Sequence, residues 1–204
     1  ANVVYTRLAG HGLESDGMEA AAEDWLQSVT DSWEIASRIG RRVVIVAVST
    51  GAPLAVWLSQ LVTNRELVHS LVFLSPNFRV RSPFGFILTW PWSRYWVPLL
   101  LGRERSWEPE NELADRYWTS RYSIHAVIEM QKVVDWVKHN PPISHNIPLA
   151  TIYMTGDPTI SHEAAVNFHH AWDASTKELL EVTIDRENPQ HVFAGDITAP
   201  HRVD

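Results

Sequence analysis

The chain has 204 residues, of which 45% are hydrophobic and 20% are charged, and its formal net charge is −7 at pH 7. This composition is typical of one globular domain and excludes collagen-like, coiled-coil and disordered chains. The acidic balance argues against a binder of nucleic acids or of anionic membranes, no apolar run reaches the ~20 residues of a membrane-spanning helix, and the absence of cysteine excludes disulfides and cysteine-based sites.

Strand-like and helix-like segments alternate along the chain. A first β-prone run, residues 2–8, ends at the loop Gly10-His11-Gly12. Runs rich in apolar, β-branched residues then predict strands that are buried on both faces, at residues 43–48, 67–74 and 149–154, and a fourth strand at residues 179–184. Apolar positions with a helical period predict helices at residues 18–39, 51–62, 123–138 and 161–172. The alternation predicts an α/β fold in which helices flank a mainly parallel sheet.

The middle of the chain departs from this alternation. Residues 78–109 hold four tryptophans and several prolines without a clear period, and residues 110–120 are polar and compatible with a helix. We therefore expect an insertion on the sheet. Its most apolar residues are Phe84, Phe86, Trp90, Trp92, Trp96, Leu99, Leu100 and Leu101. These side chains could pack the insertion onto the sheet, line an apolar acyl pocket or a lipid-facing lid, or form an exposed patch that supports a homodimer.

A candidate nucleophile lies between the strand at 43–48 and the next helix, in the sequence Ala47-Val48-Ser49-Thr50-Gly51. Hydrolases use G-x-S-x-G at such a junction because a sharp, strained turn exposes the serine hydroxyl, and only small residues fit two positions before and after it. Ala47 and Gly51 meet that demand. The N–H of Thr50, at the start of the helix, is then placed to stabilise an oxyanion. The alternative is an ordinary turn in which Ser49 caps the helix.

Two more residues complete a candidate catalytic triad. Asp157 follows the strand at 149–154, and His191 follows the strand at 179–184. Because the carboxyl ends of parallel strands lie at one edge of a sheet, these side chains can converge with Ser49 there. The chain order Ser, Asp, His is the order of α/β-hydrolases. The alternatives are that Asp157 only forms a turn before Pro158 and that His191 is a surface histidine.

Four places in the chain resemble the α/β-hydrolase superfamily, in particular its bacterial carboxylesterase and monoacylglycerol-lipase-like branch. They are the loop Leu8–Gly12, the helical sequence Glu23-Asp24-Trp25-Leu26, the turn Val48–Gly51, and His191-Val192 followed by Asp196. The resemblance implies a cap or lid formed by residues 78–138 on a core of residues 1–77 and 139–204. It also implies core strands before the glycine-histidine loop, which we expect to be missing from this chain.

The predicted function is that of a serine hydrolase which cleaves carboxylic esters, with apolar acyl chains, through an acyl-enzyme. Ser49 would be the nucleophile, His191 the base and Asp157 its orienting carboxylate, with Thr50 as an oxyanion donor. Two alternatives stay open: a thioesterase, amidase or acyltransferase on the same fold, and a non-catalytic binding protein that retains the fold. The partner is then a small ester, and neither a nucleic acid nor a transmembrane segment is expected.

No cofactor or metal is expected. The sequence lacks the glycine-rich motifs of nucleotide-binding loops. His162, His169 and His170 share one predicted helix but lack the H-E-x-x-H pattern of a zinc site, so we interpret them as solvated helix histidines. Asp135 and Asp173 fall on predicted helices, which makes them weaker candidates for the acid than Asp157.

Overall fold

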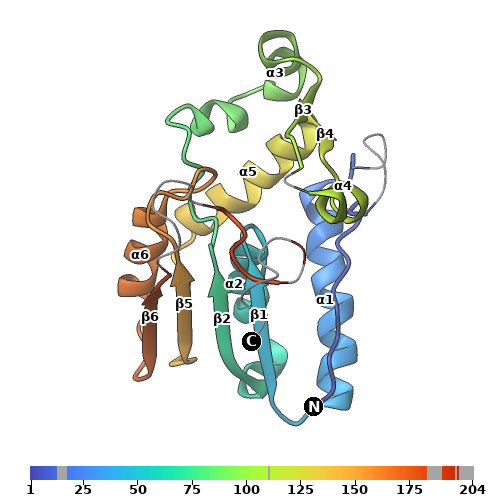
Figure 1. Ribbon diagram of the computed structural model, residues 1–204. Helices are drawn as coiled ribbons and strands as arrows, with labels where there is room; N and C mark the ends of the chain where they lie inside the picture. The colour runs from blue at the N-terminus through green and yellow to red at the C-terminus, as the bar shows by residue number, and fades with distance from the viewer. Residues whose placement is uncertain (13–17, 110, 183–189, 196, 198–204) are drawn as a thin grey trace.

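The computed structural model describes residues 1–12, 18–109, 111–182, 190–195 and 197. Its main feature is a four-stranded sheet with the strand order β1-β2-β5-β6, in which all neighbouring strands are parallel (Figure 1). The strands are β1 (Val43–Val48), β2 (Val68–Leu74), β5 (Leu149–Tyr153) and β6 (Lys177–Glu181). The predicted parallel sheet is confirmed, and β1 has the predicted bounds. β6 begins two residues before the predicted strand, whose end at residues 183–184 lies outside the described residues.

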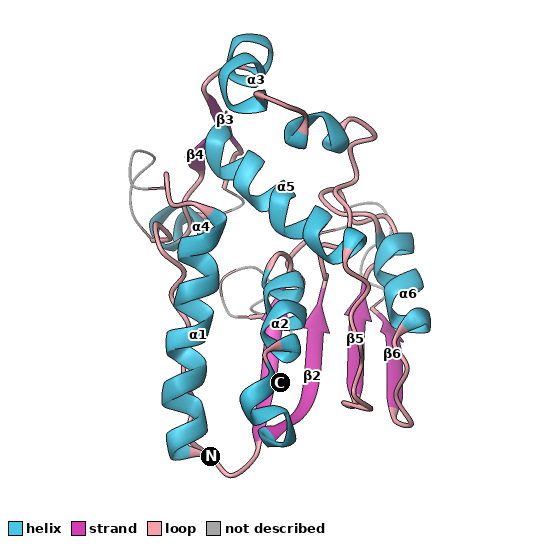
Figure 2. Ribbon diagram, turned by 180° about the vertical axis from the view of Figure 1, so that it is seen from behind, coloured by secondary structure: helices cyan, strands magenta, loops and turns pink. Residues whose placement is uncertain are grey.

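Helices lie on one face of the sheet (Figure 2). They are α1 (Ala22–Ile39), α2 (Gly51–Gln60), α5 (Ile124–His139) and α6 (His162–Ala171), with a short 3-10 helix, η2 (Val62–Leu67), before β2. The helices α2, α5 and α6 connect successive strands, whereas α1 precedes β1 and packs against α2 and α5. Two of these helices begin at serine caps, because the hydroxyls of Ser123 and Ser161 accept hydrogen bonds from the N–H groups of Ala126 and Ala164. Among the described residues, no helix combines the length and the apolar character that a membrane crossing requires.

The main core lies between the sheet and this helical layer. It contains Leu71 and Phe73 of β2, Ala52 and Val56 of α2, and side chains from α5 and β5, all of them buried. The residues in register across the strands, such as Ala47, Phe73 and Thr151, face the same side and are buried together. This layer fixes the carboxyl ends of β1, β2 and β5 relative to one another, which is what a site built from strand ends needs.

The opposite face of β1 is not buried, and here the prediction of strands buried on both faces is wrong. Val44, Val46 and Val48 point away from the helices, and Val46 is 63% exposed. The reason is the arrangement of layers, because among the described residues the helices cover only the other face of the sheet (Figures 1 and 2). The continuous apolar sequence of β1 is therefore present without the second covering layer that such a sequence normally indicates.

The predicted first strand, residues 2–8, is also not formed. The segment is irregular and runs along α1, where the side-chain amide of Asn2 donates to the carbonyl of Ile39 and the indole N–H of Trp25 donates to the carbonyl of Ala9. Val3 and Tyr5 are exposed. A β-prone sequence forms a strand only when a neighbouring strand accepts its hydrogen bonds, and this segment pairs with α1 instead.

The segment between β2 and β5 contains η3 (Gly85–Thr89), α3 (Ser93–Leu101), α4 (Glu112–Tyr117) and an antiparallel pair of short strands, β3 (Glu104–Ser106) and β4 (Arg121–Ser123). The last helix of the predicted insertion, α5, belongs to two cores. Its first half packs with Leu88 and Val97 above the sheet, and Val137 near its end packs in the main core. The division into a core and an inserted cap at residues 78–138 stays a prediction.

Candidate active site

The turn after β1 holds Ser49 in an unusual backbone conformation. Ser49 has a φ of 50°, in the left-handed region that non-glycine residues rarely adopt. Neighbouring elements hold the turn in place. The Ser49 N–H donates to the carbonyl of Leu74 at 3.0 Å, and the Ser49 carbonyl accepts from the N–H groups of Ala52 at 3.1 Å and of Asn77 at 3.0 Å. These bonds stabilise a strained turn that aims the side chain away from the sheet.

Small residues flank this turn at close range. A Cβ atom built on Gly51 would lie 3.5 Å from the Cβ of Ala47. That distance is an ordinary contact, so a methyl group would fit at residue 51, whereas the further atoms of a larger side chain would meet Ala47. Residues 47 and 51 therefore approach each other closely, as expected. Because residue 47 is alanine, an alanine would also fit at residue 51.

The three side chains that the sequence singles out lie within hydrogen-bonding distance of one another. The Nε2 atom of His191 is 2.8 Å from the Oγ of Ser49, and the Nδ1 atom of His191 is 2.8 Å from the Oδ2 of Asp157. They come from the loops after β1, β5 and β6, so the strand ends converge as expected. Two alternatives do not fit this geometry. Ser49 is not the cap of α2, because Thr50 occupies that position. His191 is not a free surface histidine, because each of its ring nitrogens lies within hydrogen-bonding distance of a partner.

Asp157 is held in a closed environment. The residue is 1% exposed, and its Oδ1 atom accepts hydrogen bonds from the N–H groups of Thr159 at 2.8 Å and Ile160 at 3.0 Å. Burial alone would raise the pKa of this carboxyl. The hydrogen bond and charge of His191, together with the two backbone N–H groups, outweigh burial and hold the pKa of Asp157 below its ordinary value. Asp157 is therefore an ionised acceptor that can orient the imidazole of His191.

Thr50 lies at the N-terminus of α2. It has a φ of −66° and a ψ of −15°, and the helix begins at the next residue, Gly51. The first N–H groups of a helix have no acceptor within the helix and carry the positive end of its dipole. The Thr50 N–H is thus a backbone donor adjacent to the Ser49 hydroxyl, which is where an oxyanion donor would be needed.

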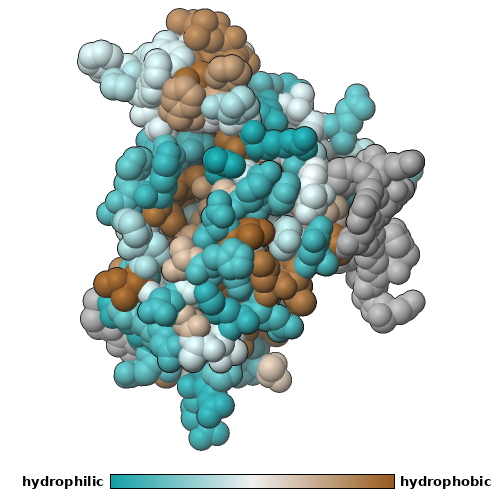
Figure 3. Space-filling model, turned by 90° about the vertical axis from the view of Figure 1, so that its left-hand side faces the viewer, coloured by the Kyte–Doolittle hydropathy of each residue, from teal (hydrophilic) through white to brown (hydrophobic). Residues whose placement is uncertain are grey.

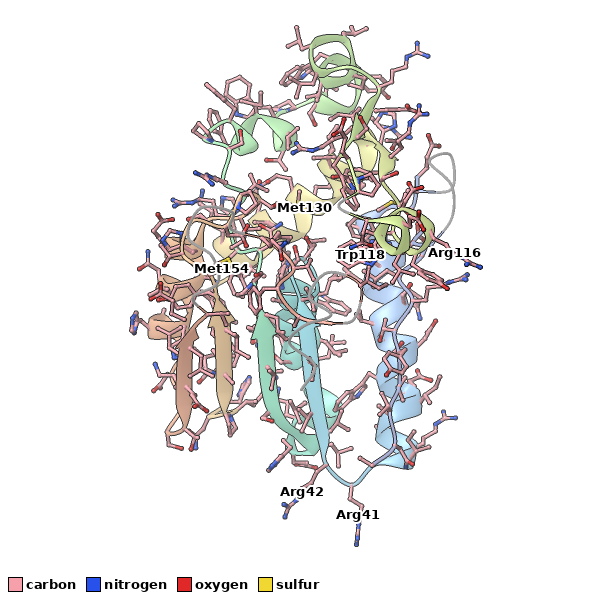
Figure 4. All side chains as sticks on the ribbon, viewed as in Figure 1. Arg41, Arg42, Arg116, Trp118, Met130 and Met154 are labelled. Carbon is pink, nitrogen blue, oxygen red and sulfur yellow. The ribbon has the colours of Figure 1, made fainter. Side chains whose placement is uncertain are left out.

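Asn77 is a residue of the site that the sequence reasoning did not single out. It is buried, and its side-chain amide donates to the Oγ1 of Thr50 at 3.2 Å and to the Sδ of Met130 at 3.1 Å. Figure 4 shows Met130 on α5, above the carboxyl ends of the strands. Asn77 therefore connects the serine turn to β2 and to α5. Its signal in the sequence is weak: it follows the end of the strand adjacent to β1, in Ser75-Pro76-Asn77.

The other candidates have structural partners elsewhere. His169 is buried, with its Nδ1 2.9 Å from the Oγ1 of Thr151, so the interpretation of a solvated histidine is wrong for this residue. Asp135 accepts from Thr89 and Gln131, and the Asp173 carbonyl accepts from Ser144. Asp196 lies outside the described residues. Within the described part of the chain, no group of three metal-binding side chains comes together.

A hollow of about 680 Å³ adjoins Asp157 between residues 78–86, α5 and the start of α6. Asp157 and Ile160 are among its lining residues, and Arg79, Lys138 and Glu163 bring charge to the lining. Ser49 and His191 are not among its lining residues. Its charged walls differ from the apolar acyl pocket that the sequence suggested.

Comparison with known proteins identifies the family of the whole chain. The family model described as "Alpha/beta hydrolase family" matches residues 1–200. No curated protein matches the sequence. Three solved structures illustrate the similarity of fold. One belongs to the metagenome-derived lipolytic enzymes LipS and LipT, with 16% identity and a TM-score of 0.73, and the match covers 96% of this chain and 75% of that one.

The other two structures are monoacylglycerol lipases. The enzyme from Paleococcus ferrophilus has 16% identity and a TM-score of 0.58 over 86% of this chain and 68% of its own. A soluble variant of the monoglyceride lipase from Saccharomyces cerevisiae, in complex with a substrate analog, has 10% identity and a TM-score of 0.59 over 85% and 65%. At these identities the likeness concerns the fold, and the predicted α/β-hydrolase fold is confirmed.

Proposed function

The chain belongs to the alpha/beta hydrolase family, and from this premise we propose that it is a serine hydrolase which cleaves carboxylic esters through an acyl-enzyme. The observation that carries the proposal is the pair of 2.8 Å contacts that link Ser49, His191 and Asp157. A serine hydroxyl is a weak nucleophile until an adjacent base takes its proton, and that base needs a partner to fix its tautomer. The contacts have the order that this chemistry requires.

In the proposed first step, the Ser49 Oγ attacks the ester carbonyl carbon while the Nε2 of His191 takes the hydroxyl proton. The carbonyl oxygen becomes an oxyanion, to which the Thr50 N–H donates. The tetrahedral intermediate then expels the alcohol, whose oxygen receives the proton from His191, and the acyl group stays on Ser49. A water molecule then attacks the acyl carbon while His191 takes its proton. The second tetrahedral intermediate breaks the bond to the Ser49 Oγ, which takes the proton back from His191, and the carboxylic acid is released.

The role of Asp157 in this scheme is to keep the proton of neutral His191 on Nδ1. The ionised carboxylate accepts from Nδ1–H, which leaves the lone pair of Nε2 facing Ser49. When Nε2 gains the serine proton, the imidazolium is stabilised by the same carboxylate. Because the pKa of Asp157 is held below its ordinary value, the carboxylate stays ionised throughout the neutral range.

For the substrate we propose esters with apolar acyl chains. The proposal is supported by the lipolytic enzymes among the structural neighbours and by the exposed apolar side chains of residues 84–101, a segment that lies beyond the carboxyl ends of the strands (Figure 1). Thioesters and amides would pass through the same intermediates, since the triad sets the reaction class and the pocket sets the substrate.

The test is hydrolysis of a series of p-nitrophenyl esters with increasing acyl length. We expect Ser49→Ala to lower kcat by about 10⁴-fold or more, because only binding and the oxyanion donor remain. Ser37→Ala, at a partly exposed serine of α1 whose hydroxyl donates to the carbonyl of Glu34, is the matched control and should keep full activity. Hydrolysis that survives in folded Ser49→Ala would contradict the assigned nucleophile. No turnover of esters, thioesters or amides by the parent chain would favour a non-catalytic binding protein.

A further inference from the structure

The upper end of the molecule, residues 84–105, exposes large apolar side chains. Trp92 is 79% exposed and Leu99 is 83% exposed, and Phe84, Tyr95, Leu100 and Leu101 are exposed beside them. Figure 3 shows hydrophobic residues gathered at this end of the molecule. We call residues 84–105 the apolar tip. Six large apolar side chains exposed in one segment are uncommon on a protein surface, and such a cluster normally marks a binding surface.

The helix within the apolar tip, α3, is apolar on its inner and its outer sides. Its inner side is anchored by Val97, which is fully buried against Leu88 and α5. The outer side carries Tyr95, Leu99 and Leu100, where an ordinary surface helix would carry charged residues. A helix whose inner and outer sides are both apolar is normally covered on both of them. Since the inner anchor already holds α3 in place, the outer side is available for a partner.

Aromatic residues dominate the rest of the apolar tip. Phe86 and Trp90 pack with their ring centroids 5.7 Å apart, and Trp90 and Trp96 pack at 6.4 Å. Trp96 also donates its indole N–H to the carbonyl of Pro91, which fixes the loop that presents Trp92. Tryptophan and tyrosine are the residues enriched where a protein meets the boundary between lipid headgroups and acyl chains.

The charge of the apolar tip is opposite to that of the whole chain. Residues 84–105 contain three arginines, Arg94, Arg103 and Arg105, and one acidic residue, Glu104, whose carboxylate pairs with Arg121. All three arginines are exposed, in a chain of net charge −7. Arginines around an apolar face can insert their stems among lipid headgroups and meet anionic phosphates.

We propose that the apolar tip docks onto an anionic lipid surface. Trp92, Leu99 and Leu100 would enter the headgroup boundary, while Arg94 and Arg103 would contact anionic headgroups. The negative net charge of the whole chain argues against such a partner. However, interactions between charges further apart than a Debye length of about 8 Å are screened at physiological salt, so the local charge of the apolar tip decides its binding. A second copy is the weaker choice of partner, since two apolar tips placed together would juxtapose their unpaired arginines.

The docked orientation places the candidate active site toward the lipid. The apolar tip and the loops that carry Ser49 and His191 both lie beyond the carboxyl ends of the strands (Figure 1). Arg41 and Arg42 lie at the other end of the molecule (Figure 4). Lipid binding itself does not depend on the proposed function, so it can be measured with Ser49→Ala protein.

The experiment is co-sedimentation of the chain with vesicles of phosphatidylcholine and phosphatidylglycerol, compared with vesicles of phosphatidylcholine alone. We expect binding to the anionic vesicles that weakens as salt is raised. Arg94→Gln with Arg103→Gln should lower the partition coefficient about 25-fold, since each arginine near an anionic surface contributes roughly a fivefold factor. Arg41→Gln with Arg42→Gln, exposed arginines far from the apolar tip, is the matched control and should bind as the parent does.

A second pair of variants tests the apolar contribution. Leu99→Ser with Leu100→Ser leaves buried Val97 in place and should abolish binding while the melting temperature stays unchanged. Ile35→Ser with Ile39→Ser, exposed residues of α1, is the control and should keep binding. The proposal is overturned if the parent chain does not bind anionic vesicles or if both tip variants bind like the parent. It is also overturned if the parent is a dimer in solution that the tip variants convert to monomers.

Discussion

At the residue scale, the site depends on the fact that the two carboxylate oxygens of Asp157 accept hydrogen bonds from different donors. Oδ1 accepts the N–H groups of Thr159 and Ile160, and Oδ2 accepts from His191. The loop thus fixes which oxygen faces the imidazole and fixes its orientation. A buried carboxylate with this many donors is both ionised and immobile, and this is the combination that the base in the proposed mechanism needs.

Asp157→Asn tests whether the carboxylate orients His191 in this way. The backbone N–H groups hold the amide oxygen of the asparagine at the Oδ1 position, so its NH₂ group faces the Nδ1 of His191 as a donor. His191 must then carry its proton on Nε2, and it cannot accept the proton of Ser49. We expect kcat for a p-nitrophenyl ester to fall by about 10³–10⁴-fold with little change in KM. Asp173→Asn is the control. A decrease of less than tenfold in a folded variant would contradict the orienting role.

The sequence alone predicted which strand ends carry Ser49, Asp157 and His191, because strand ends in a parallel sheet lie together whatever their distance along the chain. It could not single out Asn77. An asparagine after a strand is common, and its contacts with Thr50 and Met130 depend on how the loop after β2 meets α5. The two backbone N–H groups that hold Asp157 are also invisible in a sequence, since every residue but proline offers one.

At the element scale, local patterns predicted where helices and strands form but not what covers them. The serine caps of α5 and α6 and the bounds of β1 follow from the sequence. Whether β1 is buried on two faces depends on other elements, and whether residues 2–8 form a strand depends on a neighbouring strand. The same holds for His169, whose period places it on a helix while its burial comes from the contact of α6 with Thr151 of β5.

The burial of His169 makes the stability of the fold depend on pH. Burial lowers the pKa of His169 below 6.5, and the charges of Lys177 and His170 lower it further. The folded chain therefore favours neutral His169. As the pH falls below about 6.5, the unfolded chain binds a proton that the folded chain does not, so stability decreases until the lowered pKa is reached.

We expect His169→Gln to reduce this dependence, because glutamine does not titrate and can still accept from Thr151. The melting temperature of the parent should fall more than that of the variant between about pH 7.5 and about pH 5, the range in which an ordinary histidine titrates. His69→Gln, an exposed histidine of β2 that does not contribute to the lowered pKa of His169, is the control and should follow the parent. Equal pH dependence in the parent and in His169→Gln would contradict the assigned contribution.

At the scale of the whole molecule, charge and apolar surface are distributed unevenly. The net charge of −7 averages an acidic body with an apolar tip that carries three exposed arginines. The composition gives only the net charge of the whole chain. The prediction from the sequence, which used this net charge, therefore argued against an anionic lipid partner. The fold separates the two regions and places the apolar tip at the same end as the strand-end loops (Figure 1). The proposed hydrolysis and the proposed docking thus concern the same end of the molecule.

In the proposed mechanism Ser49 is a nucleophile that His191 activates. Treatment with a fluorophosphonate, followed by intact mass and peptide mapping, measures this reactivity. We expect one phosphonyl adduct per chain, located on Ser49 and absent from Ser49→Ala, with labelling strongly slowed in His191→Ala because no base takes the serine proton. An unlabelled chain, or an adduct on a different residue with Ser49 unmodified, would contradict the claim.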